Sequence, residues 1–136
     1  MLNMKKIQIV LMAIIAMTMS SCLFKTEATV DVTVKNPLGS TVGAGELVYK
    51  FVGTDKSTLY SSNADGSVAT NASGVAHFEL KSPGDFVPSG VGYDEQQTFI
   101  FCTYDKNGKR NGQMAVTLKP GDKNVPVEIK QTIIDE

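Results

Sequence analysis

Hydrophobic and polar residues alternate along most of the chain after residue 27, in runs short enough to form strands. In each run the alternate apolar residues should share one face, and the runs are 28–35 (Val30, Val32, Val34), 46–53 (Leu47, Tyr49, Phe51), 75–81 (Ala76, Phe78, Leu80), 113–119 (Met114, Val116, Leu118) and 125–131 (Val125, Val127, Ile129). Such alternation predicts strands that are buried on one face. The apolar residues of the last two runs are expected to point inward. Pro126 falls on the opposite face, which indicates a strand at a sheet edge or a strand start.

The run 96–105, QQTFIFCTYD, is apolar on both faces and predicts a central strand. One further short strand is expected around Thr58 to Ser61. No segment of helix length shows an apolar stripe with a 3.6-residue period, and turns recur about every 8–12 residues. We therefore predict an all-β fold, a single antiparallel Greek-key β-sandwich of about seven strands. Without crossover helices no βαβ unit can form, which excludes parallel-sheet enzymes.

Three segments resemble successive parts of prealbumin-like and carboxypeptidase-regulatory-like domains. They are VDVTVKNPLGSTVGAGELVYKF (30–51), ATNASGVAHFEL (69–80) and LKPGDKNVPVEIK (118–130), so the resemblance covers roughly Thr29 to Gln131. Bacterial Ig-like domains share such turns and alternating strands, so the topology is either prealbumin-like or Ig-like. The resemblance implies an accessory or interaction role, because such modules usually accompany another protein that acts.

The N-terminal segment has the layout of a secretory signal. Lys5 and Lys6 supply a positive start, residues 7–17 are apolar apart from Gln8, and Ser20 and Ser21 are small. The apolar run is much shorter than the roughly 20 residues that a membrane-spanning helix needs. The alternative, an amphipathic helix of the mature fold, would need a polar face and a helix cap, and the run shows neither.

The four residues MSSC that end this segment resemble the lipobox of bacterial lipoproteins, with Met19 where leucine is usual. The resemblance implies cleavage before Cys22 and lipidation of that cysteine, which then takes part in no disulfide or metal site. Two or more acyl chains hold a protein stably on a membrane. The expected organisation is a leader at 1–21, a lipidated tether at 22–28 and the sandwich at 29–136. Leu23, in place of an aspartate that would resemble a retention signal, favours the outer membrane of a Gram-negative bacterium.

The charge balance gives no reason to expect nucleic-acid binding. The chain has 13 basic and 14 acidic residues, and the leader holds two of the basic ones and none of the acidic ones, so the remainder carries a net charge of about −3. The nearest basic cluster, Lys106 to Arg110, follows Asp105 and is typical of a solvated turn.

The second cysteine, Cys102, has no cysteine partner left once Cys22 is lipidated. It lies in an apolar strand pattern, where a free cysteine usually behaves as a small buried hydrophobe. A reactive thiol would need a basic neighbour, and none adjoins it in the sequence. Buried packing is the favoured interpretation.

The sequence offers little catalytic or metal-binding chemistry. His77 is the single histidine and should face solvent, with no second histidine or nucleophile motif to work with. Asp105 and Asn107 faintly resemble a calcium loop, but Lys106, Lys109 and Arg110 intrude, and an Asn-Gly turn explains the same residues. We therefore expect no metal, no cofactor and no enzymatic activity.

The segment 82–95 is the longest without a strand pattern, and we consider it as a possible binding loop that uses Phe86, Tyr93, Asp94 and Glu95. Loops at the end of a sandwich often carry recognition, and loops longer than about 12 residues are uncommon without a role. The alternative is that the segment only connects the two sheets while Phe86 caps the core.

Together these features predict a non-enzymatic cell-envelope lipoprotein, held at the membrane by Cys22, that acts as a binding or assembly module. Its partner would be another envelope protein or a glycan. Glycan binding is the alternative function, although the chain has no tryptophan, and only Tyr60 and Tyr93 among its four tyrosines are expected in loops. An enzyme would need a clustered acid–base pair, which the sequence does not provide.

Overall fold

The protein is described by a computed structural model that covers residues 25–53, 59–82, 84–86 and 96–133. Its strands are β1 (Lys25–Lys35), β2 (Leu47–Val52), β3 (Ser67–Ala69), β4 (Val75–Ser82), β5 (Gln97–Tyr104), β6 (Arg110–Leu118) and β7 (Val125–Lys130), with one 3₁₀ turn, η1 (Ser61–Asn63). Within these ranges no helix is long and apolar enough to span a membrane.

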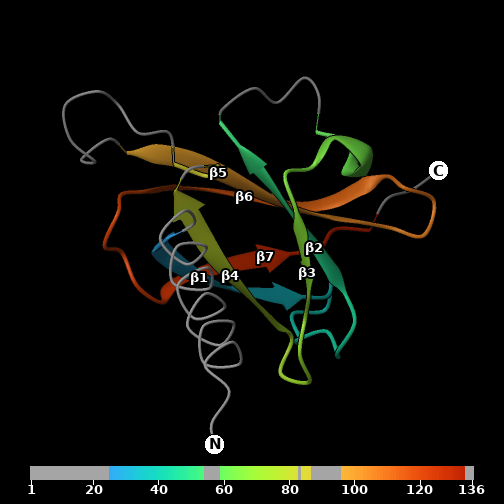
Figure 1. Cartoon of the computed structure of the whole chain (residues 1–136). Coiled ribbons are helices and arrows are strands. Elements are labelled where there is room, and N and C mark those ends of the chain that lie inside the picture. The colour runs from blue at the N-terminus through green and yellow to red at the C-terminus, as the bar shows by residue number, and fades with distance from the viewer. Residues whose placement is uncertain (1–24, 54–58, 83, 87–95, 134–136) are drawn as a thin grey trace, which may run out of the picture.

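The strands form two sheets, in the orders β4-β1-β7 and β3-β2-β5-β6 (Figure 1). This confirms the predicted β-sandwich. In the constant-type immunoglobulin arrangement the first two strands share a sheet, whereas β1 and β2 lie in different sheets here. Pairing is antiparallel in every pair except β1 and β7, which run parallel from Val30↔Val125 to Lys35↔Lys130. This one pair departs from the predicted antiparallel arrangement, because the first and last strands enter the same sheet in the same direction.

The main core lies between the inner faces of the two sheets. In β1 the residues Ala28, Val30, Val32 and Val34 are all fully buried, and they alternate with polar residues as predicted. The inward residues predicted for β4 and β7 also contact this core. From the opposite sheet β5 contributes Phe99 and Phe101, and the Phe101 ring lies 4.9 Å from that of Phe78.

β5 is buried on both faces. Its residues 99–103 are fully buried at five consecutive positions, and the strand pairs with β2 on one side and β6 on the other. The predicted central strand is therefore confirmed. Ile100 and Cys102 point away from the main core and form a second, smaller cluster with Phe51 and Leu59. The four-stranded sheet thus has apolar residues on both of its faces.

In two strands the burial of the side chains differs from the prediction made from the sequence. Leu47, Tyr49 and Phe51 of β2 do share a face, but Tyr49 and Phe51 belong to the outer cluster, while Val48 belongs to the main core. In β6, Met114 was expected inside and is 43% exposed. It pairs with the buried Phe101, but β6 is the edge of a four-stranded sheet that faces only three strands, so Met114 lacks full cover.

Two element positions also differ. The short strand expected around Thr58–Ser61 lies instead at Ser67–Ala69, where it pairs with β2 at Leu47 to Tyr49. Ser61 begins the 3₁₀ turn, and Thr58 lies outside the described residues. β1 begins at Lys25, within the expected tether 22–28, because the start of the strand pairs with the end of β4. The predicted edge position of Pro126 is confirmed, since β7 is an edge strand.

Phe86 follows β4 and is folded into the core. Its side chain is 4% exposed, and its ring packs edge-on against Phe99 with the ring centroids 5.4 Å apart. The neighbouring Asp85 forms a buried ion pair with Lys50 of β2 and also accepts a hydrogen bond from the Lys81 backbone N–H at 2.9 Å. Residues 84–86 are therefore fixed to both sheets, and an outward-pointing Phe86 in a binding loop is contradicted.

The two sheets lie close together at Gly112 of β6. A Cβ atom placed there would lie 2.5 Å from Ile129 Cγ2 and 2.5 Å from Thr103 Oγ1. We expect Gly112→Ala to lower the free energy of unfolding by about 1–3 kcal/mol, as overpacking of a core usually does. Chemical denaturation of the full chain measures this. Gly43→Ala is the control, because nothing lies within 4 Å of its added Cβ, and an equal loss in both variants would contradict the packing argument.

Truncation of Phe86 tests its place in the core. Phe86→Ala should cost about 3–5 kcal/mol of unfolding free energy, the usual range for a buried phenylalanine. Tyr60→Ala, which removes an exposed ring, should change stability by no more than about 0.5 kcal/mol. An unchanged denaturation midpoint for Phe86→Ala would return this residue to the candidates for surface recognition.

Candidate binding face on the four-stranded sheet

The outer faces of the two sheets differ in character. On the three-stranded sheet most of the outward residues are polar, and several of them interact with each other across strands. His77 Nδ1 of β4 lies 2.6 Å from Asp31 Oδ1 of β1, and Lys35 of β1 forms an ion pair of 3.3 Å with Glu128 of β7. The single histidine is thus on the solvent side, as predicted, and its ring interacts with the neighbouring aspartate.

The outer face of the four-stranded sheet is apolar at its centre. Leu59, which precedes η1, covers Phe51, Ile100 and Cys102, and the Tyr104 hydroxyl donates a hydrogen bond of 2.9 Å to the Leu59 carbonyl. The segment that contains Leu59 therefore serves as a second layer over this sheet. It covers only part of the face, because Leu47 at the start of β2 remains 44% exposed.

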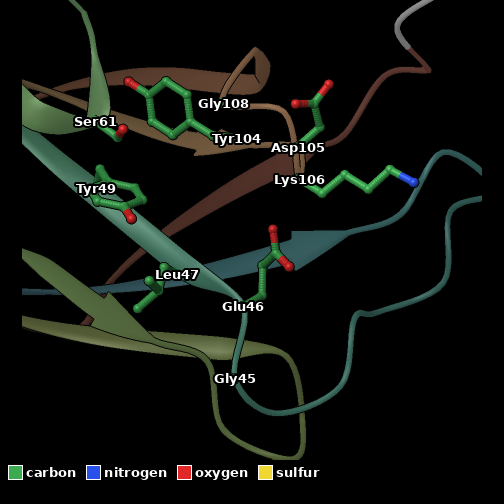
Figure 2. A pocket seen from close by; sticks show the side chains of 9 residues that line it. All are labelled: Gly45, Glu46, Leu47, Tyr49, Ser61, Tyr104, Asp105, Lys106 and Gly108. Carbon is green, nitrogen blue, oxygen red and sulfur yellow. The ribbon is translucent and has the colours of Figure 1, made fainter.

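An open groove of about 470 Å³ lies where this cover ends. It is lined by Gly45, Glu46, Leu47, Tyr49, Ser61, Tyr104, Asp105, Lys106 and Gly108 (Figure 2). The Tyr49 and Tyr104 rings meet edge to face with their centroids 5.2 Å apart. Figure 2 shows Leu47 and the two tyrosines toward one end of the groove and the charged side chains of Glu46, Asp105 and Lys106 toward the other.

The carboxylates that line the groove already have structural partners. Asp105 Oδ1 accepts hydrogen bonds from the backbone N–H groups of Asn107 (2.8 Å) and Lys109 (2.9 Å), which is the turn predicted for this segment. Glu46 Oε1 accepts a hydrogen bond of 2.9 Å from Gln131 Nε2. A groove lined by two aromatic rings and by carboxylates held in place by hydrogen bonds has the mixed lining that is typical of a ligand-binding surface.

Cys102 lies beneath this face and is fully buried, which confirms the packing interpretation. Burial raises the pKa of its thiol, and this outweighs the opposite effects of Arg110 and of a hydrogen bond with Tyr104. Burial also raises the pKa of the Tyr104 hydroxyl, with a further contribution from Cys102. Both groups therefore stay neutral near pH 7, since the ordinary pKa of each already lies above that value.

The structure separates the candidate site residues of the sequence analysis. Phe86 belongs to the core, while Cys22, Tyr93, Asp94 and Glu95 lie outside the described residues. The groove was not anticipated, because β2 was assigned one apolar face. The signal available was the occurrence of apolar residues at both odd and even positions of 47–52, which is typical of a strand buried on both sides.

No protein-family model matches the sequence, and a search of curated proteins finds no match. Among solved structures the chain is similar to the Bacillus anthracis TIE protein, with 10% identity and a TM-score of 0.40, over 79% of this chain and 17% of that one. It is also similar to GBS52, the minor pilin in the Gram-positive pathogen Streptococcus agalactiae, with 11% identity and a TM-score of 0.41, over 82% of this chain and 47% of that one. The chain spans less than half the length of either protein, and at this level of similarity neither one assigns a function to it.

Proposed function

We propose that this protein is a non-enzymatic lipoprotein of the cell envelope, which is anchored through Cys22 and binds a partner through the groove on its four-stranded sheet. The anchor is supported by the MSSC boundary and by the charged and apolar segments before it. For the fold we propose the prealbumin-like topology, because β1 and β2 lie in different sheets. The outer membrane of a Gram-negative bacterium is the proposed location, from Leu23 after the cysteine.

The observation that carries the binding role is the incomplete cover of an apolar sheet face. Leu47 is exposed beside Tyr49 and Tyr104, while the outer face of the other sheet carries charged residues. Exposed apolar area next to polar groups is typical of a recognition surface, and aromatic residues contribute strongly to binding energy. An envelope protein that presents an apolar side chain beside a charged one fits this groove.

Glycan binding is the second candidate function, and the two tyrosine rings in the groove favour it. Tyrosine rings can pack against the C–H faces of a sugar, while Glu46 and Ser61 supply oxygen acceptors for its hydroxyls. Tyr93, Asp94 and Glu95 remain proposed contributors from the segment 87–95.

The anchor is tested by Cys22→Ser in the full chain, expressed in a Gram-negative host. We expect an uncleaved or soluble product that takes up no lipid label, because the acylated residue is gone. Cys102→Ala, which removes the other cysteine, is the control and should keep both the label and the membrane association. The anchor proposal fails if the Cys22→Ser product still sediments with membranes through salt and alkali washes.

The groove is tested by Leu47→Asp, with Leu38→Asp as a matched control, because Leu38 is 90% exposed and does not line the groove. Partners are captured by chemical crosslinking of the full chain in whole cells, and glycans are presented as an array. Loss of a central apolar contact should weaken binding about 5- to 30-fold. Equal binding by the two variants would overturn the groove as the recognition surface, and array binding without protein capture would select the glycan function.

A further inference from the structure

The four edges of this sandwich are not equally protected against pairing with another strand. β4 and β7 bound the three-stranded sheet, and β3 and β6 bound the four-stranded one. A strand at an edge presents backbone N–H and C=O groups without strand partners, and natural proteins restrict such edges with short strands, prolines, charges or bulges.

Three of the edges show these devices. β3 is only three residues long. β7 contains Pro126 and the charged residues Glu128 and Lys130. β4 carries the charged residues Glu79 and Lys81.

β6 has one irregularity at its start, where its register with β5 shifts between Thr103 and Tyr104, and it lacks these devices beyond that point. It has nine residues, and the stretch 111–118, NGQMAVTL, contains no charged residue and no proline. Its first part is occupied by the C-terminal segment, since the Thr132 N–H donates a hydrogen bond of 2.7 Å to the Asn111 carbonyl. Among the described residues no strand pairs with the remaining edge, residues 113–118, on the side away from β5.

The side chains along this free edge also lack cover. Met114 faces the interior side of the sheet opposite Phe101, yet it is 43% exposed. Ala115 and Thr117, on the outer side, are exposed as well. A strand added here would gain main-chain hydrogen bonds and would bury Met114.

We propose that the occupant is a second copy of this chain, with the two β6 strands paired antiparallel about a two-fold axis. A two-fold interface requires a self-complementary surface. The stretch 113–118 meets this requirement, because it has no charge that could oppose its own copy, and like charges opposite each other would destabilise the pair. The two four-stranded sheets would join into one continuous sheet, and Met114 of each copy would lie against apolar residues of the other.

The symmetry fixes which residues can face each other. A two-fold axis perpendicular to the sheet places the outer faces of both copies on the same side. Odd-numbered residues of β6 therefore face odd-numbered residues of the other copy, and even-numbered residues face even-numbered ones. Residues 113–118 form the most pairs with their own copy when the axis passes beside residue 115 or residue 116. In the first register Ala115 faces its own copy, and in the second register it faces Thr117 of the other copy.

This proposal does not rest on the proposed function, and it is tested by crosslinking in whole cells that express the full chain. Ala115→Cys, and the double variant Ala115→Cys with Thr117→Cys for the second register, are treated with an oxidant or a short bis-maleimide. We expect a product of twice the chain mass from one or both variants, because side chains that face each other across paired strands lie about 4.5–5.5 Å apart. The parent chain and Glu128→Cys on β7 are controls that should give none.

A second substitution tests whether the strand edge itself holds the copies together. Met114→Lys in the crosslinking variants places a charge on the inner side of the edge, and should reduce the product at least fivefold, about 1 kcal/mol at 25 °C. Ile133→Lys, at another exposed apolar residue outside β6, should leave the yield unchanged, and protease resistance checks the fold of each variant. The proposal is overturned if no product exceeds the controls, if the product contains a different protein, or if Met114→Lys leaves the yield unchanged.

Discussion

The burial of β5 on both of its faces is the constraint from which the architecture follows. Five consecutive residues without solvent exposure require a neighbouring strand on each side and an apolar layer above and below. The three-stranded sheet supplies one layer, and the segment around Leu59 supplies the other. Leu59 contacts apolar residues at the centre of the outer face, while Leu47 beside the groove stays 44% exposed. The candidate binding face is thus a direct result of how β5 is buried.

The contact between the two sheets is secured by charge as well as by apolar packing. Lys50 lies on the inner side of β2 and pairs with Asp85, and both side chains are close to fully buried. A buried pair of this kind contributes little net stability compared with apolar residues, but loss of one partner typically costs about 3–5 kcal/mol. The pair therefore acts mainly as a positional constraint. It fixes residues 84–86 against β2, so that Phe86 enters the core.

The sequence predicts this fold best where one strand face is polar. β1, β4 and β7 alternate strictly, so their buried residues could be assigned from the pattern alone. β2 was assigned incorrectly because apolar residues occur at both parities, and because Lys50, a charged residue, takes an inner position through its partner Asp85. Met114 and Phe86 depend on the extent of the opposite sheet and on the path of a connecting segment. A local pattern contains neither kind of information, and the same holds for the parallel pairing of β1 with β7.

That parallel pair affects how the chain can fold as it is synthesised. β1 is the central strand of its sheet, but its partner on one side begins at Val125. Val30 therefore pairs with a residue about 95 positions later in the chain. Contacts between such distant residues form slowly, because a long loop must close first. A nascent chain that lacks its last strand keeps one side of β1 unpaired and the apolar residues of β1 incompletely covered. The closed three-stranded sheet therefore requires the last strand, so it can form only late in the synthesis of the domain.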